Sequence, residues 1–114
     1  MQTTNPLHEQ LVEVAHVDSV YLHKCLTAAI DGLEKVSSRI SKRKIRKKAT
    51  SYTRKIWENF RESRQNCRQE LADLDMRIEK AWGEKNLAEL FTLGSYIYEN
   101  LGQTLKWMEV LSEV

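Results

Sequence analysis

Apolar residues recur at steps of three and four through most of this chain, and little interrupts them. One series runs over 7–40, with Asp18 filling one of its positions, a second over 45–82 and a third over 87–108. This spacing places apolar side chains on one face of a helix. Because only four Gly and one Pro occur in 114 residues, helices are favoured over sheets. The pattern predicts an all-α protein.

Start and stop signals divide the three series. Asn5 is a candidate N-cap before Pro6, and proline is favoured at a first helical position. Gly83 suits the left-handed position after a helix, and Asn86 with Glu89 resembles a capping box. We expect an antiparallel three-helix bundle in one domain, 1–114, with helices at about 6–37, 42–82 and 86–112. The start of the second helix is open between 41 and 51.

The first and third helices carry more apolar residues than one buried stripe needs. Those off the main stripes are Val17, Val20, Ile30, Tyr96, Trp107, Val110 and Val114. A three-helix monomer would leave them wet, so we expect a homodimer. The expected core includes Leu22, Cys25, Leu33, Ile56, Phe60, Cys67, Leu71, Leu90, Ile97 and Leu101.

The net charge of +2 hides a strong asymmetry. The stretch "SKRKIRKKATSYTRK" at 41–55 contains eight Lys or Arg and no acid. No Asp or Glu lies within 35–57, where ten basic residues occur, and the rest of the chain holds eight basic and sixteen acidic residues. Such segregation says more about binding partners than the total charge does.

Several of these cations fall on one line if the segment is helical. Lys47, Arg54, Arg61 and Arg68 are seven apart, and residues seven apart drift by only about 20° around a helix. From Arg43 to Arg68 the line would be roughly 37 Å long. The candidate site residues, here called the basic ridge, are Lys42, Arg43, Lys44, Arg46, Lys47, Lys48, Arg54, Trp57, Arg61, Arg64 and Arg68.

A positive ridge of this length could follow a phosphate backbone, with Trp57 available to stack on a base. We therefore expect a nucleic-acid-binding accessory or regulatory protein. The alternative is a protein–protein adaptor, chaperone or inhibitor that docks on an acidic partner. A merely solvated face, and a basic amphipathic helix of the membrane-surface or calmodulin-target type, remain open as well. No arrangement of residues suggests an enzyme or a bound cofactor.

Histidines and cysteines give weaker signals. His8, His16 and His23 are spaced eight and seven apart, which suits surface histidines better than metal ligands. We therefore expect no metal site. Cys25 and Cys67 lie on apolar stripes and are expected to be core thiols of a cytoplasmic protein. We expect neither a signal peptide nor a transmembrane segment, since "LFTLGSYIY" is too short to span a bilayer.

Overall fold

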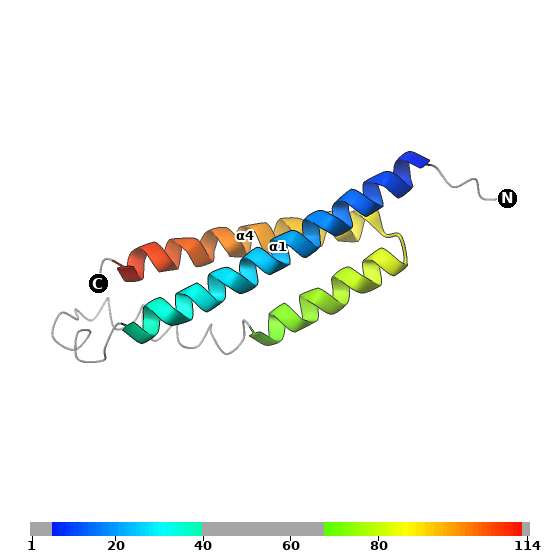
Figure 1. The fold of residues 1–114 in the computed structure, drawn as a ribbon. Helices are drawn as coiled ribbons and strands as arrows, with labels where there is room; N and C mark the ends of the chain where they lie inside the picture. The colour runs from blue at the N-terminus through cyan, green and yellow to red at the C-terminus, as the bar shows by residue number, and fades with distance from the viewer. Residues whose placement is uncertain (1–5, 40–67, 113–114) are drawn as a thin grey trace.

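The computed structural model describes residues 6–39 and 68–112, with side chains described at 6–36 and 68–110. These residues form α1 (Pro6–Arg39), a helix over 68–83, here called the middle helix, and α4 (Leu87–Ser112). The described residues contain no strand. The three helices lie side by side, and the middle helix runs opposite to α1 and α4 (Figure 1). The predicted all-α three-helix bundle is thus confirmed for the described part of the chain, whereas the basic start expected at 41–55 lies outside it.

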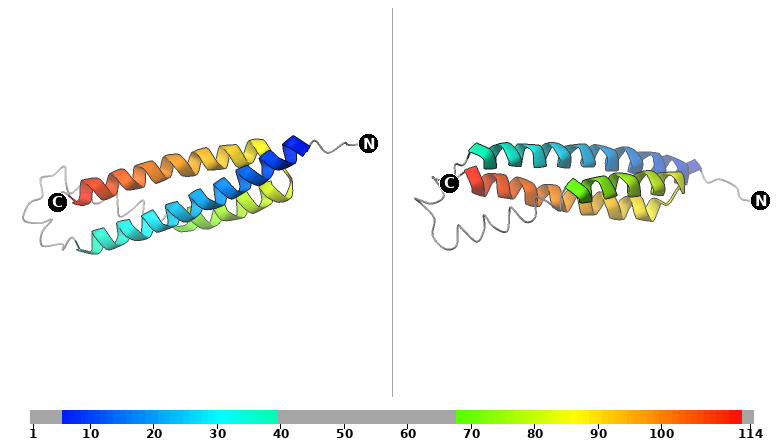
Figure 2. Two further views of the ribbon diagram at one scale, coloured as in Figure 1. Left: turned by 45° about the horizontal axis from the view of Figure 1, so that its top comes forward. Right: turned by 90° about the horizontal axis from the view of Figure 1, so that it is seen from below.

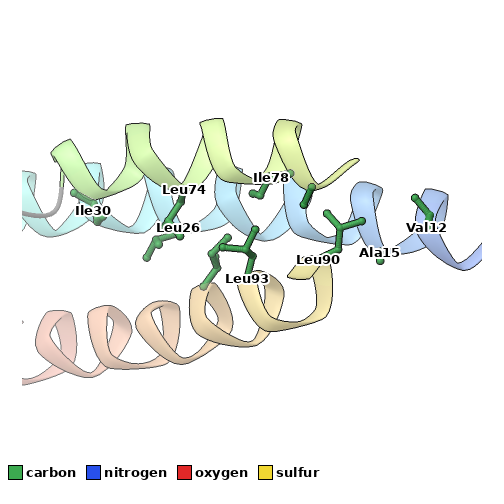
Figure 3. Packing of buried hydrophobic residues seen from close by; sticks show 10 residues of the cluster. Val12, Ala15, Leu26, Ile30, Leu74, Ile78, Leu90 and Leu93 are labelled. Atoms are coloured by element: carbon green, nitrogen blue, oxygen red, sulfur yellow. The ribbon is translucent and has the colours of Figure 1, made fainter. Parts of the chain in front are cut away.

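One main core fills the space where all three helices meet (Figure 3). Ile78, Leu90 and Ile97 are completely buried there. The other buried members are Val12, Ala15, Leu26, Ile30, Leu74, Ala81 and Leu93. Farther along the bundle, Leu33 packs with Trp107 in a smaller cluster. Both clusters combine residues from α1 and α4, so they hold these helices together along much of their length.

The packed face of α1 differs from the predicted stripe in its N-terminal half. Leu7, Leu11, Val14 and Asp18 were expected to face the core, and all are exposed. Val12, Ala15 and Ser19 are buried in their place. Small side chains let α4 approach closely, and the Ser19 hydroxyl is satisfied by donating to the Leu90 carbonyl at 3.3 Å. The prediction followed the largest apolar residues, which is why it was wrong here.

The predictions of the core residues and of the apolar residues off the main stripes are each confirmed in part. Leu33, Leu90 and Ile97 are buried, and Leu22, Cys25, Leu71 and Leu101 are half-buried. Ile56, Phe60 and Cys67 lie outside the described residues. Of the residues expected off the main stripes, Ile30 is buried, Val20 and Trp107 are half-buried, and Val17, Tyr96 and Val110 are exposed; the side chain of Val114 is not described.

The turn between the middle helix and α4 corrects one prediction. The left-handed residue is Lys85, with φ of 54°, and not Gly83. Lys85 N–H donates to the Trp82 carbonyl and Asn86 N–H to the Ala81 carbonyl, the two hydrogen bonds of a Schellman motif. Asn86 then caps α4, because its Oδ1 accepts from the Glu89 N–H at 3.1 Å.

Within α1, α4 and the described part of the middle helix, no stretch is both long and apolar enough to cross a membrane.

Candidate functional site

Arg68 is the one member of the basic ridge that falls within the described residues. The other ten, Lys42 to Arg64 as given above, lie outside them. Arg68 is the first described residue of the middle helix, remote from the turn, and it contacts α1. The geometry of the ridge is therefore known at its C-terminal boundary.

At this boundary Arg68 is held by carboxylates of α1. Its Nε and Nη2 donate to the two oxygens of Glu34 at 3.0 and 2.7 Å, and Asp31 lies 3.6 Å from Nη2. Hydrogen bonding to Glu34, followed by the charges of Glu34 and Asp31, raises the pKa of Arg68. Arg68 stays charged, but its charge is engaged by Glu34 and Asp31 of the same molecule.

Acidic residues dominate the described bundle. Residues 6–39 and 68–112 include thirteen Asp or Glu and eight Lys or Arg. Asp73 and Asp75 follow Arg68 on the middle helix, and both are exposed. A polyanion would be repelled by this part of the molecule, so the acidic bundle and the basic ridge divide the chain into two electrostatic regions.

The three histidines all make contacts toward the middle helix or its turn. His8 Nε2 donates to the Lys85 carbonyl at 3.2 Å, and His23 Nε2 donates to the Leu71 carbonyl at 2.7 Å. His16 Nε2 lies 3.4 Å from Glu79 Oε1. Histidines seven and eight residues apart on α1 thus each contact the middle helix or its turn, whereas the sequence pattern had indicated surface histidines.

His16 belongs to a small aromatic and acidic cluster. Its ring stacks on Trp82, with centroids 4.1 Å apart and planes 9° from parallel. The Trp82 Nε1–H donates to Glu13 at 3.2 Å, and Glu9 pairs with Lys85 at 2.9 Å one turn away. Among the described residues no three His, Cys, Asp or Glu side chains are arranged to hold a metal ion. The cluster is a set of paired groups that joins two helices.

A hollow of about 530 Å³ lies between the middle helix and α4. Glu70, Asp73 and Arg77 line it on one side and Thr92 and Tyr96 on the other. Tyr96 donates to Glu70, and Arg77 pairs with Glu89 at 2.8 Å. Glu70 and Arg77, two of the charged groups that line the hollow, are thus each engaged by another side chain of the bundle.

A different surface lies along the outer edge between α1 and α4, on the side away from the middle helix. Its centre is a groove of about 450 Å³ that is lined by small residues, among them Ala15, Ser19, Gly94 and Ser95. Two large exposed side chains, Phe91 and Tyr98, also line the groove. We call this surface the outer face and define it by Leu7, Leu11, Val14, Tyr21, Phe91, Tyr98 and Leu105, all of them exposed.

Helical spacing explains why these residues gather on one side. Leu7, Val14 and Tyr21 are seven apart on α1, so they lie near one line, as do Phe91, Tyr98 and Leu105 on α4. Each line is roughly 21 Å long. The heptad steps were visible in the sequence, but only the packing shows that this stripe faces outward.

Among the described residues, the outer face is the surface on which large apolar side chains are exposed, and Arg68 marks the C-terminal boundary of the basic ridge. Comparison of the chain with models of protein families, with curated proteins and with solved structures found no match.

Proposed function

We propose that this chain is a non-enzymatic accessory or regulatory protein that binds nucleic acid without sequence preference through its basic ridge. The observation that carries the proposal is the segregation of charge: ten Lys or Arg lie within 35–57 with no acid among them. A face that serves only solubility normally mixes both signs. The acidic character of the described bundle sharpens this contrast.

The proposed mechanism is electrostatic. Lys and Arg of the ridge neutralise backbone phosphates and release condensed counterions, which makes affinity fall steeply with salt. Phosphate contacts position a protein without reading bases, so affinity varies little with sequence. Arg68 is expected to contribute little, because Glu34 already accepts two of its hydrogen bonds.

The outer face favours a second candidate function. Exposed Phe91 and Tyr98 on α4 are the kind of side chains that anchor protein interfaces. In this alternative the chain is an adaptor, chaperone or inhibitor whose basic ridge docks on an acidic protein. Homodimerisation is compatible with either candidate, and so is a cytoplasmic location, which the free thiol of Cys25 would suit.

The test measures the fluorescence anisotropy of labelled duplex DNA and single-stranded RNA over a range of salt concentrations. The ridge variant replaces Arg43, Lys47 and Arg54 by Gln. It should bind at least about tenfold more weakly at moderate salt, and the slope of log affinity against log salt should fall by about three. Arg68→Gln alone should change affinity by less than about twofold.

A matched control removes the same amount of charge elsewhere. Lys24, Lys80 and Lys106 are exposed on α1, the middle helix and α4, and their replacement by Gln should leave the slope unchanged. Equal losses in both triple variants would show that only net charge matters. If wild-type protein binds neither duplex DNA, single-stranded RNA nor heparin at about 50 mM salt, the nucleic-acid proposal is wrong and the acidic-protein alternative takes its place.

A further inference from the structure

The groove between α1 and α4, at the centre of the outer face, is left open by the described residues. Its volume is about 450 Å³, and residues of both helices line it. Among them, Ser19 is buried, and its hydroxyl already donates to the Leu90 carbonyl. Phe91 and Tyr98 line the same groove and are 56 and 67% exposed. Because the buried hydroxyl is satisfied and aromatic rings stand beside it, the groove favours an apolar occupant.

The charged groups of the groove are all acidic. Asp18 of α1 and Glu99 of α4 line it, and both are exposed. None of the ten described residues that line the groove is Lys, Arg or His. Glu9, elsewhere on α1, is paired with Lys85, whereas neither groove acid forms an ion pair within the described part of the chain. A cationic partner would therefore meet two carboxylates that no described side chain neutralises.

Backbone hydrogen bonding decides which form of chain suits the groove. The backbone N–H and C=O groups of α1 and α4 are used within each helix, so an extended segment would find no ladder of hydrogen bonds there. A helix satisfies its own backbone and can lie along two neighbouring helices, as in a larger bundle. The groove thus suits an amphipathic helix with Lys or Arg beside its apolar stripe. Another copy of the bundle suits it less, because the described residues include thirteen acids and eight bases.

We propose that this groove binds a basic amphipathic helix of a partner protein. The apolar stripe of that helix packs over the small residues and against Phe91 and Tyr98, and its Lys or Arg side chains lie beside Asp18 and Glu99. The faces of the two aromatic rings attract cations as well. The groove is a surface separate from the basic ridge, so the inference does not depend on nucleic-acid binding.

Isothermal titration calorimetry on the full chain tests the proposal with two designed helical peptides. One has Leu at helical spacing and Lys elsewhere, and the other has Glu in place of every Lys. The Leu/Lys peptide should bind at least about tenfold more tightly than the Leu/Glu peptide. Replacing Asp18 by Asn and Glu99 by Gln should weaken its binding about fivefold at low salt, because exposed charge pairs contribute modestly. Ser95→Trp places a large side chain in the groove and should weaken binding at least about tenfold.

A matched control replaces Asp75 by Asn and Glu84 by Gln, two exposed acids outside the groove, and should keep the wild-type affinity within about twofold. Circular dichroism should show that every variant stays helical. The proposal is wrong if the Leu/Lys peptide does not bind, if the Leu/Glu peptide binds as tightly, or if the control loses as much affinity as the groove variants. A dimer that excludes the peptide and is lost in Ser95→Trp would assign the groove to a second copy instead. The ridge variant should bind the peptide at least as tightly as the wild type, so the two proposals fail separately.

Discussion

The two long seams of α1 are built in different ways. Toward the middle helix, polar side chains cross the seam from His8 at one end to Glu34 at the other. Toward α4, the Ser19 hydroxyl donates to the Leu90 carbonyl, and small residues line the groove between the two helices. Long polar side chains thus bridge α1 and the middle helix on the surface of the bundle. Between α1 and α4, small residues line the groove, and the large side chains Phe91 and Tyr98 beside them stay exposed.

The views in Figure 2 show how the three helices are arranged around these seams. The middle helix lies along one side of the α1 and α4 pair, and among the described residues nothing covers the other side. Within the described residues, the two seams of α1 therefore differ in the side chains that cross them, polar toward the middle helix and small toward α4. The following predictions test this difference.

The largest effect is expected in the core that all three helices share. Ile78→Ala should cost about 2–5 kcal/mol of unfolding free energy, because Ile78 is fully buried and truncation leaves a cavity. Met76→Ala, two residues away and 71% exposed, should cost less than about 0.5 kcal/mol. Urea unfolding followed by circular dichroism measures both. Similar values for the two variants would contradict the assignment of the buried face.

The next effect compares an aromatic residue of each seam. Trp82→Ala should cost about 1–2 kcal/mol, because it removes the stack on His16 and the hydrogen bond to Glu13. Phe91→Ala should change the stability of the monomer by less than about 0.5 kcal/mol, when measured at a concentration at which the chain does not associate.

A double-mutant cycle isolates the stacking itself. Trp82→Ala and His16→Ala should couple by about 0.5–1.5 kcal/mol. A coupling energy near zero would mean that the stack of His16 on Trp82 does not stabilise the packing of α1 against the middle helix.

Glycine substitutions probe how tightly the α4 seam is packed. Gly94→Ala should stabilise by about 0.5–1 kcal/mol, because a Cβ there meets Ser19 Oγ at an ordinary contact distance of 3.5 Å. Gly102→Ala, with open space around it, is the reference for the gain in helix propensity. Gly32→Ala should gain less, since its Cβ would lie 3.2 Å from Met108 Cε. Thermal unfolding ranks the three, and a loss at Gly94 would show that the seam has no room to spare.

The smallest effect lies in the turn that precedes α4. Lys85→Gly should stabilise by a few tenths of a kcal/mol, since glycine adopts a φ of 54° without strain. The gain is reduced by loss of the exposed ion pair to Glu9, which contributes about 0.2–1 kcal/mol. Glu84→Gly in the same turn offers no such relief and should destabilise. If both variants lower the melting temperature equally, the left-handed residue has been misplaced.

Helical content and the order of the helices could be predicted from spacing and from the scarcity of Gly and Pro. Rotation of α1 about its axis could not. Its N-terminal half carries two apolar series side by side, one through Leu11 and Val14 and one through Val12 and Ala15. Local spacing does not distinguish them, because the choice depends on how closely α4 approaches and on a partner for the Ser19 hydroxyl.

Less of the candidate site could be predicted. The ridge was inferred from spacing alone, and the contacts of Arg68 with Glu34 and Asp31 join residues 34 and 37 positions apart, beyond the reach of a local pattern. The cross-helix contacts of His8, His16 and His23 were missed for the same reason. An acidic pair one turn apart on α1, at Asp31 and Glu34, was the available signal.

The short turn at 84–86 has a consequence for how the chain folds. It joins the middle helix to α4 across three residues, so little loop-closure entropy opposes their pairing. The contacts of α1 with α4 and the turn, such as Ser19 to Leu90 and His8 to Lys85, instead join residues more than 70 positions apart. We therefore expect the helical hairpin to form first and α1 to dock later. Leu93→Ala should then slow folding, whereas Val12→Ala should mainly speed unfolding, and the reverse pattern in stopped-flow kinetics would place α1 in the nucleus.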